Sequence, residues 1–335
     1  MEKLKAFYKK FQIPLLILLA VVALVLPLVM KTSAVRIYCR ILMYCTLAGS
    51  LNVINGYSGQ TCLGQAGFFA VGAYTMSILI MKFNISFWIL LPVAGIMAAL
   101  VGGLISIPTL RMKGIYLSMV TLGAAEMIRI IALNWTSVTG GAYGIKGITR
   151  PILFGMKIKS PMQFAYLFLA IAVLFIFVTR RVLKSRVGRA WLAIREGELA
   201  AKSLGVESAR YKVTNFMYGA FWAGIAGAVY APYLQYIDSN SFTLNEGFNI
   251  LSMVILGGQG TLAGPVVGSI LVNVLTEVLR PIGNWRYVFY ATLIIAMMWV
   301  RPQGVVGVAS KGITGNLATR KKKAKTKKSE VSSNG

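Results

Sequence analysis

The chain has 335 residues, of which 57% are hydrophobic and 13% charged, and its formal net charge is +26. About a quarter of the residues in soluble domains are charged, so this composition excludes an ordinary soluble domain and indicates an integral membrane protein. The sequence has no histidine, which excludes His-based acid–base catalysis and removes the commonest metal ligand. The nine acidic residues form no metal-binding cluster in the sequence.

The positive charge gathers in three segments, since residues 1–10, 180–212 and 311–330 hold 21 of the 35 Lys and Arg residues. Basic segments of membrane proteins stay on the cytoplasmic side. We therefore predict a transmembrane domain over 1–310 and a basic, disordered cytoplasmic tail over 311–335 that contacts membrane lipid. No folded basic domain or aromatic platform accompanies the tail, so no nucleic-acid partner is expected.

Long uncharged stretches predict transmembrane helices, because a helix needs about 20 apolar residues to cross a bilayer. The first, over 13–30, is interpreted as an uncleaved span because it is longer than the roughly 7–15 residues of a signal-peptide core; a signal peptide is the alternative. With both termini cytoplasmic, eight or ten spans satisfy parity, and the short pair within 248–279 leaves both open. The further predicted spans are 37–55, 67–82, 87–110, 114–133, 161–180, 213–236, 248–257, 264–279 and 286–301.

Two uncharged or nearly uncharged stretches are too long for one span. Residues 41–81 contain no charge and would form a helix about 60 Å long, twice the hydrocarbon thickness. The sequence "GYSGQTCLGQAG" at 56–67 predicts the break. Residues 247–279, with Glu277 as their only charge, are interrupted in the same way by "GGQGTLAGP". Irregular backbone is not tolerated by lipid, so both breaks should be buried or line a hydrated cavity.

Interrupted helices in corresponding halves of a membrane protein point to a transport pathway. On this interpretation Gln60 and Gln259 would offer hydrogen bonds to a zwitterion that passes through the protein. The alternative is that the glycines only allow helices to pack closely, and both interpretations stay open. The residues placed on the predicted pathway are Gly59, Gln60, Gly64, Gly257, Gly258, Gln259 and Gly260.

The segment 180–212 stands out as charged sequence inside an apolar chain. The spacing of Trp191, Ile194, Glu198 and Ala201 predicts one helix that ends at Gly205, a usual residue just past a helix C-terminus. Its small-residue surface suits insertion into a groove of a partner protein. An amphipathic helix lying on the membrane surface is the alternative.

Charged residues also occur within the predicted spans. Glu126 and Arg129 lie one turn apart, and Glu277 and Arg280 repeat the spacing. Charges inside a membrane are costly enough to suggest function, but a pair at this spacing can neutralise itself. We interpret both pairs as structural.

The motifs together resemble a known family. The stretch "AIREGELAAKSLGV", with ExAAxxxG at Glu198, Ala200, Ala201 and Gly205, is similar to the coupling-helix loop of ABC importer permeases. Over about residues 35–308 the chain resembles the branched-chain amino acid permease family, in its M-type subunit. The other motifs are "SLNVINGYSGQTCLGQAGFFAVGAY" at 50–74, "RMKGIYLSMVTLGAAEMIRI" at 111–130, "TGGAYGIKGI" at 139–148, "MVILGGQGTLAGPVVGS" at 253–269 and "WVRPQGVVG" at 299–307. Small departures are Cys62, where Ser is common, and Gly67, where Ala is common.

The resemblance implies an all-α, polytopic ABC importer permease-like fold of about 8–10 transmembrane helices with two Gly-rich broken segments. It implies a second homologous permease, two cytoplasmic ABC ATPases and an extracytoplasmic solute-binding protein as partners, in the bacterial cytoplasmic (inner) membrane. The chain lacks a GxxxxGK[ST] phosphate loop, so ATP would be used by the partners, and no cofactor is expected here.

The resemblance also assigns roles to residues. Arg195, Glu196 and Glu198 would make polar contacts with an ATPase, while Ala200, Ala201 and Gly205 would shape the inserted surface. The binding protein would touch Thr139, Gly140 and Gly141 on the outward-facing segment.

The function expected first is ATP-driven import of leucine, isoleucine and valine. A urea or short-amide ABC permease is the close alternative, because nothing in these residues separates the substrates. A stand-alone channel or ion-coupled carrier would need more buried carboxylates. A membrane enzyme is the weakest hypothesis, since no nucleophile with a base can be assembled.

Overall fold

The computed structural model describes residues 30–112, 114–153, 156–158 and 160–280, with isolated positions between 24 and 28 and between 291 and 306. The predicted span 286–301 is largely outside these residues, as is most of the span 13–30. The predicted tail 311–335 is entirely outside them. The total of eight to ten spans and the side on which the termini lie therefore stay predictions.

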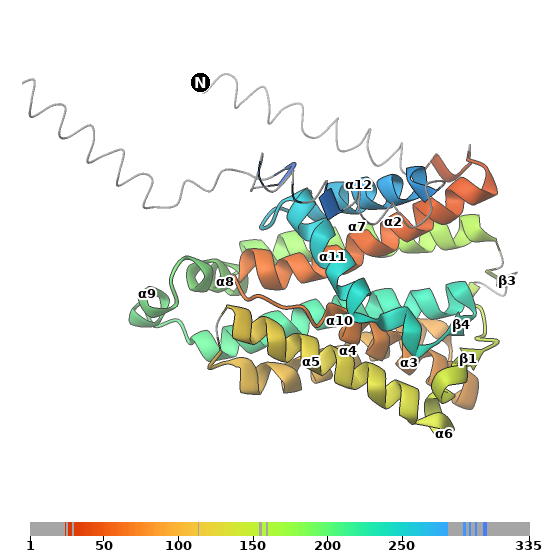
Figure 1. Cartoon of the computed structure of the whole chain (residues 1–335), viewed down its shortest axis with the longest axis horizontal. Helices are drawn as coiled ribbons and strands as arrows, with labels where there is room; N and C mark the ends of the chain where they lie inside the picture. The colour runs from red at the N-terminus through yellow and green to blue at the C-terminus, as the bar shows by residue number, and fades with distance from the viewer. Residues whose placement is uncertain are drawn as a thin grey trace, which may run out of the picture.

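The described part is a bundle of helices that lie roughly side by side (Figure 1). Five of them are long and apolar enough to cross a membrane, and a sixth, α10, has 27 residues. The protein is thus a helical integral membrane protein, as predicted. These helices are α2 (Thr32–Asn52), α3 (Gln65–Phe83), α4 (Phe87–Thr109), α5 (Ile115–Asn134), α7 (Pro161–Lys184) and α10 (Ser208–Leu234).

Short elements gather at the two ends of the bundle. The helices α8 (Arg186–Glu196) and α9 (Glu198–Ser203) project at one end, and α6 (Thr136–Thr139) lies at the other with β1 and β4 (Figure 1). Strand β1 pairs antiparallel with β4, and β2 with β3. The remaining short elements are η2 (Gly141–Tyr143), β1 (Ile145–Lys146), β2 (Ile152–Leu153), β3 (Met156–Lys157), β4 (Tyr236–Ile237) and η3 (Ser239–Phe242).

Helix α10 forms the centre of the bundle and packs against α3 and α4. Small residues allow this close approach: a β-carbon built on Gly95 would lie 2.8 Å from the ring of Phe221, and one on Gly102 would lie 2.5 Å from Cβ of Ala220. Membrane helices associate through such van der Waals packing. Helix α5 is outermost, since only 22% of its most apolar stretch is buried, compared with 83% for α2.

Both predicted breaks are confirmed. Helix α2 passes into a short π-helix, η1 (Val53–Tyr57), and irregular backbone follows until α3 begins. The second break separates α11 (Leu244–Gly257) from α12 (Gly264–Val278). With 14 and 15 residues, each of these helices is about 21–22 Å long, shorter than the roughly 30 Å hydrocarbon core. They form a hairpin of two short helices.

The prediction of one helix over the charged segment is wrong. The segment forms α8 and α9, which are separated at Gly197. Glycine weakens a helix interior because it loses more backbone freedom on folding than any other residue, and here its backbone is extended. The predicted end is confirmed, since Gly205 follows α9 with φ +81° in the left-handed region.

Candidate functional site

The two glycine-rich breaks meet each other in space. The side chain of Asn52, at the end of α2, donates from Nδ2 to the Thr261 carbonyl at 2.8 Å. Its Oδ1 accepts from the backbone N–H of Gly260, 208 positions along the chain, also at 2.8 Å. A β-carbon on Gly56 would lie 3.0 Å from Cα of Gly260. Residues 56–64 and 257–263 therefore form one unit, called here the glycine junction.

The first loop of the glycine junction is fastened by its own residues and by α5. The Asn55 amide donates to the Cys62 carbonyl at 3.2 Å and accepts from the Cys62 N–H at 3.0 Å. The backbone N–H of Leu63 donates to Oγ1 of Thr121 at 3.0 Å. The irregular backbone thus has partners within the protein, as a break at membrane depth requires.

The two glutamines predicted to share a role lie in different environments. Gln60 is buried, and its amide nitrogen donates to Oγ of Ser58 at 2.8 Å and to Oδ1 of Asn215 on α10 at 3.4 Å. Gln259 is exposed. Gln60 therefore fastens the loop to α10, and a role of either glutamine with a substrate stays a prediction.

The predicted pathway glycines make close backbone contacts. A β-carbon on Gly64 would lie 2.8 Å from the Thr121 carbonyl oxygen, and Gly257 lies directly against Gly264 at the α11–α12 turn. Gly258 has φ +116° and Gly260 φ +74°, conformations that other residues rarely adopt. These contacts support the close-packing interpretation, and the place of these glycines on a pathway stays a prediction.

Arg195 connects the charged segment to both loops of the glycine junction. A β-carbon on Gly59 would lie 3.2 Å from Cγ of Arg195, and one on Gly260 would lie 2.5 Å from its Nη1. The structure places the side chain of Arg195 along the junction of its own chain, although the residue is exposed, and its predicted contact with an ATPase stays a prediction. A cavity of about 210 Å³ opens beside it, lined by Ser58, Gly59, Gln60, Met112, Gly114, Leu117, Ile194, Arg195, Gly197, Glu198 and Lys212.

The charged segment is held firmly on α10. The Nζ of Lys212 donates to Oε1 of Glu198 at 2.8 Å, and the Lys212 side chain is 8% exposed. Trp191, fully buried, donates from Nε1 to the carbonyl of Tyr211 at 3.0 Å. Glu198, which we expected to contact a partner, therefore fixes α9 within this chain.

The outward surface of α9 differs from the predicted one. Ala201 is 2% exposed and packs inward, whereas Ala200 faces outward. The exposed surface belongs mainly to Leu199 and Leu204, which are 77% and 83% exposed, and Glu196 is exposed beside them. Sequence reasoning missed both leucines, although two leucines in the charged sequence "ELAAKSL" were a usable signal.

Buried and half-buried amides are the other residues that sequence reasoning missed. Asn52, Asn55 and Asn215 each tie one segment of backbone to another. The signal was present, because amides inside uncharged spans need hydrogen-bond partners. The sequence could not show which groups these amides would hydrogen-bond.

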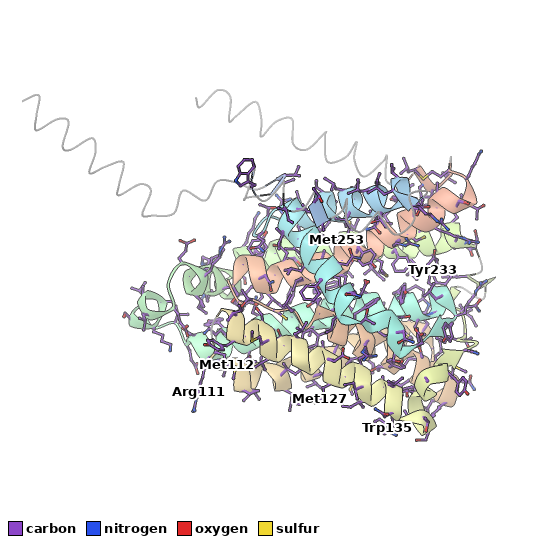
Figure 2. All side chains as sticks on the ribbon, viewed as in Figure 1. Arg111, Met112, Met127, Trp135, Tyr233 and Met253 are labelled. Carbon is purple, nitrogen blue, oxygen red and sulfur yellow. The ribbon has the colours of Figure 1, made fainter. Side chains whose placement is uncertain are left out.

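At the opposite end of the bundle, the predicted binding-protein residues form a turn. Thr139 is buried and its hydroxyl donates to the carbonyls of Ala132 at 2.6 Å and Trp135 at 2.7 Å. Gly140 and Gly141 have positive φ and make the turn possible. Figure 2 shows Trp135 at this end and Arg111 and Met112 at the end of α4 that lies near α8 and α9. The exposed aromatic side chains of the turn region are Trp135, 55% exposed, and Tyr143, 82% exposed.

The two charge pairs form as the sequence predicted. Arg129 donates from Nε to Oε1 of Glu126 at 2.8 Å, and Arg280 from Nη1 to Oε1 of Glu277 at 3.0 Å. The first pair is partly exposed on α5, with side-chain exposures of 20% and 28%. Within the described part of the chain, no three acidic or cysteine side chains are grouped to hold a metal ion.

Comparison with known proteins points to one family. The profile described as "branched-chain amino acid transport system / permease component" matches residues 33–298. The high-affinity branched-chain amino acid transport system permease protein LivM of Escherichia coli K12 is 37% identical over 314 residues, covering 87% of this chain and 74% of that protein.

More distant relatives belong to similar import systems. A probable branched-chain amino acid transport permease protein LivM of Methanocaldococcus jannaschii is 28% identical and covers 64% of this chain and 66% of its own length. The autoinducer 2 import system permease protein LsrC of Escherichia coli O9:H4 is 27% identical, with 54% of this chain and 53% of that protein covered. No solved structure matches the chain.

Proposed function

Because the chain belongs to the branched-chain amino acid transport permease family, we propose that it is the membrane-spanning permease subunit of an ATP-driven importer for leucine, isoleucine and valine. It acts in transport and not as an enzyme, and its partner subunits hydrolyse ATP. The observation that carries the mechanism is the position of Arg195, which lies against Gly59 and Gly260 and so joins the projecting segment to both broken helices.

The projecting segment couples the ATPases to the bundle. An ATPase groove receives the exposed face of α9, formed by Leu199, Ala200 and Leu204, with Glu196 at its rim. The Glu198–Lys212 ion pair supports this role, because it makes α9 move with α10. Arg195 then passes the displacement to the glycine junction. Gly205 contributes by ending α9 and leaving Leu204 at its exposed tip.

A second homologous permease covers α5. This helix is the least buried of the long helices and carries Glu126 and Arg129 on a partly exposed face. Charges facing lipid are costly, whereas a neighbouring helix can shield them. Exposed Met119 and Met127, the latter labelled in Figure 2, supply apolar surface on the same helix.

The solute-binding protein docks at the end opposite α8 and α9. The turn at Thr139, Gly140 and Gly141 holds the loop that exposes Tyr143, with Trp135 beside it. Aromatic side chains are enriched in protein interfaces. The three turn residues thus act by shaping the loop, and the aromatic residues make the contact.

The complex lies in the bacterial cytoplasmic (inner) membrane, with the α8–α9 end, both termini and the basic tail in the cytoplasm. The nine basic residues of segment 180–212 support this orientation, because positively charged loops are retained on the cytoplasmic side.

Copurification from native membranes tests the assembly. The tagged chain is extracted gently, and associated proteins are identified by mass spectrometry. We expect two ATPases and a second permease with the natural chain. A Leu199→Asp, Leu204→Asp variant should lose the ATPases but keep the second permease. Leu234→Asp, at the exposed opposite end of α10, is the matched control and should keep both.

Ala200→Arg is a single substitution that tests the same exposed face of α9. It is preferable to a substitution at Gly205, because Gly205 has a positive φ and any side chain there would be strained. If the chain purifies alone, it works as an independent channel or carrier and the coupling role fails. Uptake of radiolabelled leucine and urea by the complete complex in proteoliposomes identifies the substrate. If the complex takes up urea but not leucine, the proposed substrate is wrong.

A further inference from the structure

A large polar cavity lies away from the glycine junction, between α2, η3, α11 and α12. Its volume is about 970 Å³, at the upper end of the range of small-molecule sites, roughly 300–1,000 Å³. None of the roles assigned above uses it. The described residues that line it are Arg40, Asn240, Ser241, Thr243, Asn245, Glu246, Phe248, Asn249, Ser252, Leu275, Thr276, Leu279 and Ala291.

The cavity contains one cation and one anion that are not paired with each other. Arg40 on α2 and Glu246 on α11 are the charged residues of its wall. Among the residues that the structure describes, neither side chain forms an ion pair. The two charges therefore face a common space.

The carboxylate is held in a fixed position. The Tyr44 hydroxyl, from α2, donates to Oε1 of Glu246 at 2.6 Å. Tyr44 is 8% exposed, so its ring gives the hydroxyl little freedom. Hydrogen bonds to a charged group are among the stronger ones in proteins, and this one aims the carboxylate from α11 at the cavity.

The rest of the wall is divided between polar and apolar groups. The side chain of Asp238 accepts from the N–H and hydroxyl of Ser241 at 3.1 and 2.6 Å, which fixes the polar turn η3. Phe248, Leu275 and Leu279 supply apolar surface from α11 and the end of α12. Most of the lining residues are polar or charged and the large apolar ones lie on α11 and at the end of α12, so the wall suits a ligand that carries both charged groups and a small apolar part.

We propose that this cavity binds one α-amino acid zwitterion, with its ammonium group on Glu246, its carboxylate on Arg40 and its aliphatic side chain against Phe248, Leu275 and Leu279. The ammonium group of a zwitterion can pair with Glu246 while its carboxylate pairs with Arg40. One bound molecule therefore neutralises both residues. An uncharged amide such as urea would leave both unpaired. The proposal rests on the proposed function, since it names where in the chain the transported amino acid binds.

The position of the cavity connects it to the glycine junction. Glu246 lies in the first turn of α11, and Gly257, at the end of the same helix, begins the second loop of the junction. Eleven residues of helix span about 16 Å, so a ligand that moves the start of α11 also bears on the loop that touches Arg195. Ser252, on the same helix, lies along the wall between the two.

Photolabelling of the complete complex in lipid nanodiscs tests the site. The probe is a diazirine analogue of leucine, which keeps both charged groups and attaches to nearby side chains on irradiation. Labelled peptides are located by mass spectrometry. We expect labelling within 244–252 and 271–279, and competition by leucine but not by urea.

Two variants remove one charge each with little change of shape. Glu246→Gln and Arg40→Gln should each lower the labelling of these peptides about tenfold or more, the cost of removing a hydrogen-bonding partner of a charged group. The matched controls are Glu277→Gln, next to the cavity wall on α12, and Arg36→Gln, one turn before Arg40; neither residue lines the cavity, and labelling should persist.

Competitors that lack one charge assign the two subsites. Leucinamide has no carboxylate, so its competition should depend on Glu246 and be unaffected by Arg40→Gln. The acid 4-methylpentanoate has no ammonium group, and its competition should depend on Arg40 alone. The reverse pattern would overturn the assignment.

Labelling that is absent, lies elsewhere or is unchanged in both variants would overturn the proposal. Leucine uptake by the same complex separates this result from a failure of the proposed function. Leucine uptake without labelling of the cavity would refute the binding site and leave the proposed importer function standing. A complex that transports no branched-chain amino acid would refute the importer function.

Discussion

The two ends of this protein treat their charged residues in opposite ways. At the end that carries α8 and α9, Glu198 is paired with Lys212 at 2.8 Å and both side chains are largely buried. Toward the other end, Arg40 and Glu246 line a common cavity and form no ion pair with a described residue. A paired charge holds one helix on another, whereas an unpaired charge is available to a ligand. The ion pair at the first end keeps the shape of that end, whereas the cavity toward the second end leaves two charged groups available to a ligand.

The largest effect is expected where a side chain would separate the two loops of the glycine junction. A methyl group on Gly56 would meet the backbone of Gly260 and the Asn52 amide, and such overpacking costs about 1–3 kcal/mol. Gly56→Ala should lower the thermal stability of the purified complex and abolish most uptake.

Gly123→Ala is the matched control for this change, with stability measured on this chain purified without the second permease, because α5 is the helix proposed to face that subunit. A β-carbon on Gly123, in the middle of α5, meets nothing within 4 Å. Alanine is favoured over glycine in a helix interior by up to about 1 kcal/mol, so stability should be equal or higher. If both variants behave alike, the close approach of the two loops is not what Gly56 provides.

Loss of the Glu198–Lys212 ion pair should destabilise only the end that carries α8 and α9. Lys212→Met leaves the Glu198 carboxylate, 16% exposed, without its nearest cation, which we expect to cost about 1–3 kcal/mol of local stability. Hydrogen–deuterium exchange over 186–207 should rise, and uptake should fall severalfold with the ATPases still bound.

Lys202→Met is the control for Lys212→Met, because Lys202 lies farther from Glu198, at 3.7 Å, and is 56% exposed. Exposed pairs contribute little. Equal exchange in the two variants would mean that α9 is held by packing and not by the ion pair.

A smaller effect is expected for a change beside the cavity of Arg40 and Glu246. Tyr44→Phe removes the hydroxyl that donates to Glu246 and keeps the ring. The leucine concentration that gives half-maximal competition against the photolabel should rise about three- to tenfold, since the carboxylate is less well positioned. Exchange over 186–207 should stay unchanged, and a rise there would show that the two ends are not separate.

The smallest effect is expected for the exposed pair on α12. Arg280 is 71% exposed and Glu277 31%, and surface ion pairs contribute roughly 0–1 kcal/mol. Glu277→Gln should therefore leave stability, uptake and labelling within about twofold of the natural chain. A clear loss in any of these would give this pair a role that its exposure does not suggest.

Several features followed from the sequence because their causes are local. Residues 41–81 carry no charge and are too long for one span, so the break near Gly59 was predictable, as was the break near Gly258. The end of α9 at Gly205 was predictable from the type of residue alone. The motifs in their order also predicted the family, and the profile match over 33–298 confirmed it.

Other features could not be read from the sequence because contacts between distant residues decide them. The spacing of Ala200 and Ala201 did not tell which would face outward, and packing of Ala201 against the bundle left Leu199 and Leu204 exposed instead. The single helix predicted over the charged segment was wrong at Gly197, where glycine's weak helix preference allowed the chain to turn.

The sequence by itself determined the class of protein, the two breaks and the charged segment, since composition and bilayer thickness suffice for these. Only the tertiary structure decided that Asn52 ties the two breaks together, that Arg195 lies along both, and that Arg40 and Glu246 share a cavity. The partners lie 65 or more positions apart along the chain, and their proximity follows from how α2, α8 and α11 pack and from nothing local to either partner.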